Sequence, residues 1–119
     1  MYKIKNILQN FNYELGPFKI FDKKVVSFLN EISKRILSSK RYNKFTDLAT
    51  FAFWCRRKNV QALSDTYSNN NLIVGRDCIL HICPSNVPMN FAYSLAFGLI
   101  SGNNNIVKLP SRNFFQVKY

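Results

Sequence analysis

The stretch CILHICPSNVP, residues 78–88, decides the fold of this chain. Residues 78–83 are nearly all apolar, which is typical of a strand that lies in a parallel sheet and is covered on both faces. A turn bounded by two prolines follows, and the second of them, Pro88, is placed to occupy the first position of a helix. The stretch therefore predicts a strand that leads through a short turn into a helix.

Residues 89–109 predict the rest of a strand–helix–strand unit. Residues 89–101 are apolar almost all round, as in a helix that is buried on more than one side, and Gly102 suits the left-handed position that ends it. A loop of three asparagines then leads to a second strand at residues 106–109. The connection is longer than the roughly twelve residues that a right-handed parallel crossover needs, so we predict the α/β fold class.

The first half of the chain is predicted to be mainly helical. Residues 22–39 carry apolar side chains at the spacing of an amphipathic helix, and Asp22 is placed to cap its N-terminus. A second helix is predicted from about Thr46 or Asp47 to Tyr67. Residues 1–20 show no clear period and fit either a strand or irregular structure. We expect the helices to form a core under the sheet.

The chain has 119 residues, which is enough for one domain at most. We interpret it as a single incomplete domain, in which residues 1–71 form a mainly helical part and residues 72–119 begin a nucleotide-binding βαβ region. Two parallel strands with a few helices leave strand edges and apolar helix faces uncovered, which natural domains avoid. The sequence therefore predicts a fragment of a larger α/β fold that is inactive on its own.

The chain is strongly basic, with 17 Lys and Arg residues, 6 Asp and Glu residues and a formal net charge of +11. A basic chain attracts phosphate, so a small nucleic-acid-binding module is one interpretation. Most of the cations lie in the first half, however, several of them on predicted helix faces, and none of the usual nucleic-acid-binding motifs is present. We therefore expect no specific nucleic-acid partner.

Three cysteines, an odd number without a secretory leader, argue against a disulfide framework and favour a cytoplasmic protein. Because no two of them form a C-x-x-C pair, we predict no metal site. We expect all three to be buried as small apolar residues, and His81 to be a hydrogen-bonded core residue. No apolar run approaches the roughly 18 residues that span a bilayer, so we expect no membrane span.

Three motifs taken together resemble the opening cofactor-binding segment of the aldehyde dehydrogenase superfamily: HICPSNVP at 81–88, GLISGN at 98–103 and IVKLPSR at 106–112. Within this superfamily the chain is most similar to the acyl-CoA reductases of the bacterial luminescence fatty-acid reductase type, and FWCRRK at 53–58 adds to the resemblance. The glycine-rich dinucleotide fingerprint is absent. The resemblance implies a Rossmann-type cofactor-binding domain.

The resemblance also implies an activity, that of an oxidoreductase. The chain would be the N-terminal part of an NADPH-dependent enzyme that reduces a fatty acyl thioester to a fatty aldehyde, with NADH as the alternative cofactor. The thioester would form on a cysteine elsewhere in the full chain. The expected partners are acyl-CoA or another acyl thioester, and a protein that transfers or activates acyl groups. The alternatives are a related reductase of the glutamyl-phosphate or semialdehyde type and the basic nucleic-acid-binding module.

Asn86 is the one catalytic residue that the resemblance assigns. It would donate its side-chain amide to the oxyanion of a thiohemiacetal intermediate. A neutral carboxamide suits this role because it needs no titration, and one such donor contributes roughly 3–4 kcal/mol. The alternative role for Asn86 is to cap the helix that follows.

Five residues are predicted to bind the cofactor. Lys108 would contact the hydroxyls of the adenosine ribose, and its alternative is an ordinary lysine in solvent. Ser111 and Arg112 would engage the 2′-phosphate of NADPH, because a guanidinium can bind phosphate through two hydrogen bonds; the alternative for Arg112 is an exposed charge. Pro84 and Ser85 would lie against the cofactor through their backbone.

Overall fold

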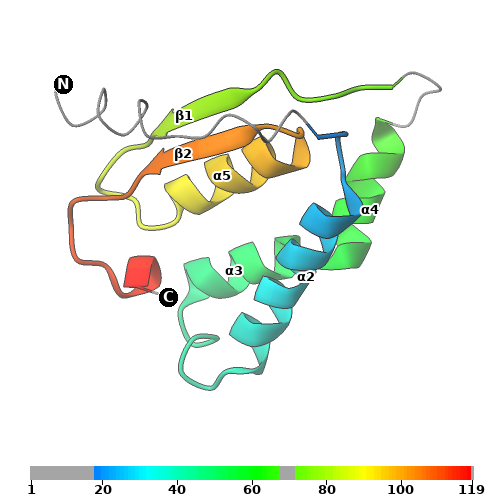
Figure 1. The fold of residues 1–119 in the computed structure, drawn as a ribbon. Helices are drawn as coiled ribbons and strands as arrows, with labels where there is room; N and C mark the ends of the chain where they lie inside the picture. Colours follow the sequence, from blue (N-terminus) through cyan, green and yellow to red (C-terminus); the bar gives the residue numbers. More distant parts are fainter. Residues whose placement is uncertain (1–17, 68–71, 119) are drawn as a thin grey trace, which may run out of the picture.

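Helices form the first part of the chain, and a pair of parallel strands follows them (Figure 1). The computed structural model describes residues 18–67 and 72–118, so most of the ambiguous N-terminal stretch lies outside the described residues. The helices are α2 (Lys23–Ser38), α3 (Thr46–Trp54), α4 (Arg57–Thr66) and α5 (Asn90–Ile100). The strands are β1 (Cys78–Ile82) and β2 (Asn104–Lys108), and a short 3-10 helix, η1 (Phe115–Lys118), ends the described chain.

The two strands pair in parallel and α5 connects them, as the sequence predicted for this part of the chain. The register runs from Cys78 opposite Asn104 to Ile82 opposite Lys108. Helix α5 packs on the sheet from one side (Figure 1). In its described residues the protein is thus a mixed helix and strand domain with a two-stranded parallel sheet. Strand β2 begins two residues before the predicted start, because the asparagines at its start pair with β1.

Strand β1 is far more exposed than predicted. Its apolar side chains Ile79, Leu80 and Ile82 are 36%, 45% and 64% exposed, and only His81 is buried. The prediction of a strand covered on both faces is therefore wrong for the described residues. The reason is that α5 packs on one face of the sheet and no other described strand pairs with β1.

Helix α2 matches its prediction closely. It begins one residue after Asp22, whose side-chain Oδ1 accepts a hydrogen bond from the backbone N–H of Lys24 at 2.8 Å. This bond satisfies one of the amide groups that have no partner within the first turn of a helix. The apolar residues Val26, Leu29 and Ile36 of α2 are buried against the other helices, in keeping with the predicted amphipathic pattern, although Phe28 is 53% exposed.

The second predicted helix is in fact two helices. The chain turns at Arg56, whose φ and ψ of −57° and 138° are not helical. The side-chain amide of Asn59 donates to the backbone carbonyl of Phe53 at 2.7 Å, and the side-chain Oδ1 of Asn30 accepts from the backbone N–H of Arg57 at 2.9 Å. Side chains therefore satisfy the backbone groups on both sides of the break. This arrangement lets α3 and α4 take separate directions against α2.

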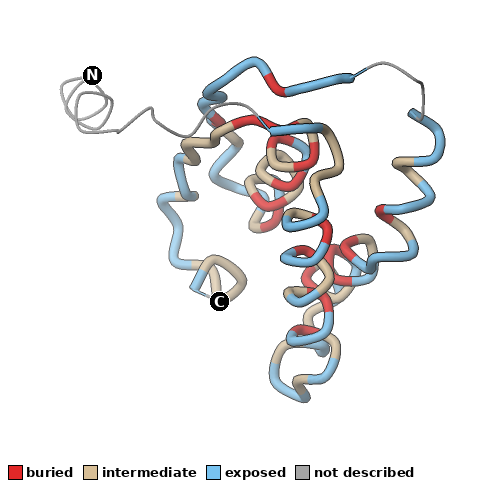
Figure 2. The backbone as a smooth tube through the Cα atoms, turned by 45° about the vertical axis from the view of Figure 1, so that its right-hand side comes forward, coloured by how far each residue is buried: buried red, intermediate tan, exposed pale blue. Residues whose placement is uncertain are grey.

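The hydrophobic core lies among the helices. Figure 2 shows the buried positions gathered where the helices pack together, while β1 is exposed along most of its length. Helix α2 packs against α3, α4 and α5, so α5 lies between the sheet and the other helices. The buried apolar residues are Val26, Leu29, Ile36, Leu48, Phe51, Ala52, Cys55, Val60, Met89, Ala92, Ala96 and Ile100.

The ends of α5 determine how the strands connect. Pro88 precedes the N-cap residue Met89 and does not occupy the first helical position, which corrects the prediction. At the other end Gly102 has a φ of +81°, the left-handed conformation that was predicted for it. The N–H of Phe18 donates to the Gly102 carbonyl at 2.9 Å, and the N–H of Gly75 donates to the Phe18 carbonyl at 3.0 Å. Three distant segments therefore meet at the end of α5.

Candidate cofactor-binding site

The carboxyl ends of β1 and β2 lie at the same edge of the sheet. The parallel register places Ile82, the last residue of β1, opposite Lys108, the last residue of β2. The loops that leave both strands start from this edge (Figure 1). In open α/β sheets, ligands bind in the crevice beyond the carboxyl ends of the strands. The fold thus places the two loops that carry the predicted site residues beside each other.

All six predicted site residues are exposed. Three of them, Pro84, Ser85 and Asn86, lie in the loop that leaves β1. Lys108 ends β2, and Ser111 and Arg112 lie in the segment that follows it. Within the described chain this edge therefore carries an amide, two hydroxyls, an ammonium and a guanidinium. These groups match the hydrogen-bonding oxygens and the negative charge of a phosphorylated dinucleotide.

Asn86 does not cap the following helix. The N-cap residue of α5 is Met89, and no side chain donates or accepts a capping hydrogen bond there. Asn86 lies in a turn three residues before Met89, and its carboxamide makes no hydrogen bond to any described residue. The alternative role for Asn86, that of capping the following helix, is therefore not observed. The amide is available to a ligand at the sheet edge.

Lys108 and Arg112 form no ion pair with a described carboxylate. The ion pair observed in residues 18–67 and 72–118 joins Arg35 to Glu31, 3.4 Å apart on the surface of α2. Among the described residues, no neighbouring acid therefore compensates the charge of these two cations at the carboxyl edge of the sheet. An anion at this edge would meet them without first breaking a salt bridge.

The cysteines depart from the prediction that all three are buried. Cys55 is completely buried, and burial raises the pKa of its thiol to about 12. Cys78 at the start of β1 is exposed, however, and Cys83 just after β1 is partly exposed. Cys78 lies on β1 and Cys83 directly follows it, and α5 covers only one face of this strand, which is the physical reason for the error. In the described part of the chain no three residues of the kinds that bind metals come together.

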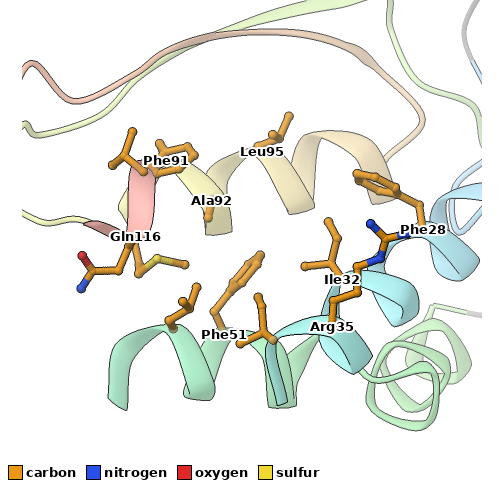
Figure 3. Close-up of a pocket in the computed structure, with 12 residues that line it drawn as sticks. Phe28, Ile32, Arg35, Phe51, Phe91, Ala92, Leu95 and Gln116 are labelled. Carbon is orange, nitrogen blue, oxygen red and sulfur yellow. The ribbon is translucent and has the colours of Figure 1, made fainter. Parts of the chain in front are cut away.

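A cavity among the helices was not predicted from the sequence. It has a volume of about 420 Å³ and lies between α5, α2, α3 and η1 (Figure 3). Apolar side chains such as Ile32, Phe51 and Leu95 form its walls, and Arg35 and Gln116 lie at opposite ends. The side-chain amide of Gln116 donates to a carboxylate oxygen of Asp47 at 2.9 Å, which ties η1 to α3. The lining residues come from four separate elements that meet only through tertiary packing, so no local sequence pattern predicts the cavity.

No family model matches the chain, and neither the curated proteins nor the solved structures contain a match to it. None of the described helices has both the length and the apolar character that crossing a bilayer requires.

Proposed function

We propose that this chain is the cofactor-binding N-terminal part of an NADPH-dependent acyl-CoA reductase of the aldehyde-dehydrogenase type. One observation supports the proposal most strongly: the loops after β1 and β2, which carry the motif residues, emerge from the same edge of a parallel strand pair. The proposal extends the observed fold to that of a Rossmann-type domain, and it gives NADPH the role of hydride donor. The protein would work in the cytoplasm.

Lys108 and Arg112 are the residues proposed to hold the adenosine end of NADPH. Both are exposed at or just after the carboxyl end of β2, and both carry a charge opposite to that of a phosphate. The ammonium of Lys108 would bind the ribose hydroxyls, and the guanidinium of Arg112, with the hydroxyl of Ser111, would bind the 2′-phosphate. Pro84 and Ser85 would line the cofactor through the backbone of the loop after β1.

Asn86 is proposed to stabilise charge on the substrate. Its exposed carboxamide lies in the loop that leaves β1, beside the edge to which the cofactor would bind. The acyl group would be held as a thioester on a cysteine that these 119 residues do not supply. Cys55 is unsuited to that role because its thiol is buried and its raised pKa keeps it protonated. In the complete enzyme, Asn86→Ala should therefore lower turnover more than it lowers cofactor affinity.

Titration with NADPH tests the proposed cofactor site. Replacing Lys108 with Ala removes one charge-assisted hydrogen bond, so the dissociation constant of NADPH should rise about tenfold. Lys34→Ala is the matched control, because Lys34 is also an exposed lysine but lies on α2. Equal affinity of the Lys108→Ala variant and the unaltered chain would show that β2 does not carry the cofactor residues.

The same chain can be tested as a basic nucleic-acid-binding module. That alternative predicts retention on DNA that falls steeply with salt, since binding would release counterions from many phosphates. Several cations of the chain already lie over its own aromatic rings, including Arg41 over Phe115 at 5.0 Å and Arg56 over Phe53 at 4.7 Å. The reductase proposal predicts only weak retention that does not depend on DNA sequence.

A further inference from the structure

The imidazole of His81 is hydrogen-bonded through both ring nitrogens. Its Nδ1 lies 2.7 Å from the hydroxyl of Ser94 on α5, and its Nε2 lies 2.8 Å from Oδ1 of Asn105 on β2. The His81 side chain is almost completely buried, with 7% of the residue exposed. Ser94, His81 and Asn105, from the adjacent elements α5, β1 and β2, are thus joined in one chain of hydrogen bonds. None of these residues belongs to the proposed cofactor site.

The hydrogen-bond network fixes which nitrogen of His81 carries the proton. The side-chain N–H of Asn105 donates to the Asn103 carbonyl at 2.7 Å, so the carboxamide oxygen of Asn105 is the atom that faces His81. A carbonyl oxygen only accepts, so Nε2 of His81 must be the protonated nitrogen of the neutral ring. Nδ1 is then a free acceptor, and the hydroxyl of Ser94 donates to it.

Gly98 makes this arrangement possible. It lies one turn after Ser94 on α5, and a Cβ at this position would collide with the Asn105 carboxamide and the His81 ring. Any larger residue would push the ring or the amide away. The absence of a side chain at Gly98 therefore lets α5 approach the strands closely enough to bring Ser94 to His81.

An open groove gives access to the serine. It has a volume of about 510 Å³, runs between β1 and α5, and is lined by Ser94 and His81 together with apolar side chains that include Ile82 and Phe97. Ser94 is only partly buried, so a small molecule in the groove can reach its hydroxyl. The walls favour an apolar group beside a polar reacting centre.

We propose that Ser94 is a nucleophile that accepts an acyl group from activated esters bound in this groove. The Oγ of Ser94 attacks the carbonyl carbon, and its proton moves to Nδ1 of His81. The bond from the carbonyl carbon to the leaving oxygen then breaks, and the departing alkoxide takes the proton from Nδ1. Asn105 holds the ring in the tautomer that can accept the proton. The result is an ester on Ser94 and a free alcohol.

The roles of the two ring nitrogens are exchanged relative to the serine protease triad, in which the Nε2 atom contacts the serine. Either nitrogen of a neutral imidazole can accept a proton when the other is the donor, so this exchange preserves the chemistry. The cluster contains a nucleophile, a base and an orienting group, but no donor for the developing oxyanion is part of it. We therefore expect slow acylation by activated compounds and no rapid turnover of ordinary esters.

Labelling with a fluorophosphonate tests the proposal on the chain itself. In this reaction Oγ of Ser94 bonds to phosphorus, fluoride leaves, and the proton passes through His81 to solvent. The native protein should gain the mass of one adduct, and peptide mapping should place it on Ser94. Ser94→Ala should abolish the adduct, whereas His81→Gln should slow its formation at least tenfold. Ser101→Ala is the matched control, because Ser101 lines the same groove but donates to the Phe97 carbonyl at 2.7 Å.

Two further measurements separate a nucleophile from a purely structural hydrogen bond. Denaturing the native protein in urea should abolish the labelling, because the hydroxyl of an isolated serine does not react at an appreciable rate. Asn105→Asp is a second variant, for the case that His81→Gln does not fold. It keeps an acceptor for Nε2 and should therefore retain labelling. No adduct on the folded chain, an adduct on Ser101 in place of Ser94, or equal labelling of the folded His81→Gln variant would overturn the proposal.

Discussion

Lys108 lies opposite Ile82 in the parallel pairing of β2 with β1. This register places the carboxyl ends of both strands at the same level, so the loops that follow them start side by side. The prolines, serine and asparagine after β1 and the lysine, serine and arginine after β2 are thereby presented at one edge of the sheet. The proposed cofactor site depends on this relationship more than on any single side chain.

Arg112 should determine the preference for NADPH over NADH. Because its guanidinium is proposed to bind the 2′-phosphate, Arg112→Ala should weaken NADPH binding about tenfold and leave NADH binding unchanged. Titrations with the two cofactors measure the ratio directly. Arg76→Ala is a suitable control, since Arg76 is an exposed arginine just before the opposite, amino-terminal end of β1. A ratio unaffected by Arg112→Ala would remove this residue from the site.

Asp22 should stabilise the fold through its capping hydrogen bond. The side chain accepts from the N–H of Lys24 at 2.8 Å, and loss of such a cap costs about 1 kcal/mol of the free energy of unfolding. Urea denaturation of Asp22→Ala measures this cost. Glu31→Ala is the control, because the exposed ion pair of Glu31 with Arg35 should contribute less than about 0.5 kcal/mol. Equal stabilities of the two variants would contradict the assignment of the cap.

The three thiols should differ in reactivity. A thiol reagent should modify the exposed Cys78 quickly and the partly exposed Cys83 more slowly in the folded protein. Cys55 is buried and its pKa is raised to about 12, so it should react only after unfolding. Mass spectrometry of the modified peptides gives the order. Modification of Cys55 at the rate of Cys78 in the folded chain would show that the helical core is not packed as described.

The same burial makes stability depend on pH in alkaline solution. The ordinary pKa of the thiol is 9.0, and burial of Cys55 raises it to about 12. Between these values the unfolded chain loses the proton while the folded chain keeps it, so the free energy of unfolding falls as the pH rises. Below about pH 9 both states are protonated and the effect vanishes.

Cys55→Ala should therefore reduce the alkaline loss of stability, as followed by denaturation at a series of pH values. Some loss should remain, because the pKa of Tyr93 is also raised, by its burial and by the nearby Cys55 and Asp47. A variant with the same alkaline slope as the unaltered chain would show that the Cys55 thiol does not contribute.

Local sequence patterns predicted those helix ends that are marked by a characteristic residue at the end itself. The capping Asp22 marks the start of α2, and Gly102 marks the end of α5 with a positive φ. The break between α3 and α4 escaped prediction because it depends on Asn30, which reaches the N–H of Arg57 from 27 residues away in the sequence. A bond of that kind has no local signal.

The exposure of β1 also lay beyond sequence reasoning. Its apolar residues predicted burial, but burial depends on which other elements cover the strand, and among the described residues only α5 packs on the sheet. The sequence correctly predicted that the candidate residues lie at or shortly after the carboxyl ends of the two strands. It showed neither that Asn86 is free of the helix cap nor that His81 bonds to Ser94 and Asn105, since both facts arise from tertiary geometry.

Nuclear magnetic resonance of the ¹⁵N-labelled chain tests the central claim most directly, because it shows where NADPH binds. Addition of NADPH should shift the amide signals of the non-proline residues in the two loops at the carboxyl edge of the sheet, and leave those of α2 in place. These residues are Ser85, Asn86, Val87, Lys108, Leu109, Ser111 and Arg112, since Pro84 and Pro110 have no amide proton. Shifts confined to the amino-terminal edge, near Cys78 and Asn104, or to the basic surface of the helices would contradict the claim that this edge is the cofactor site.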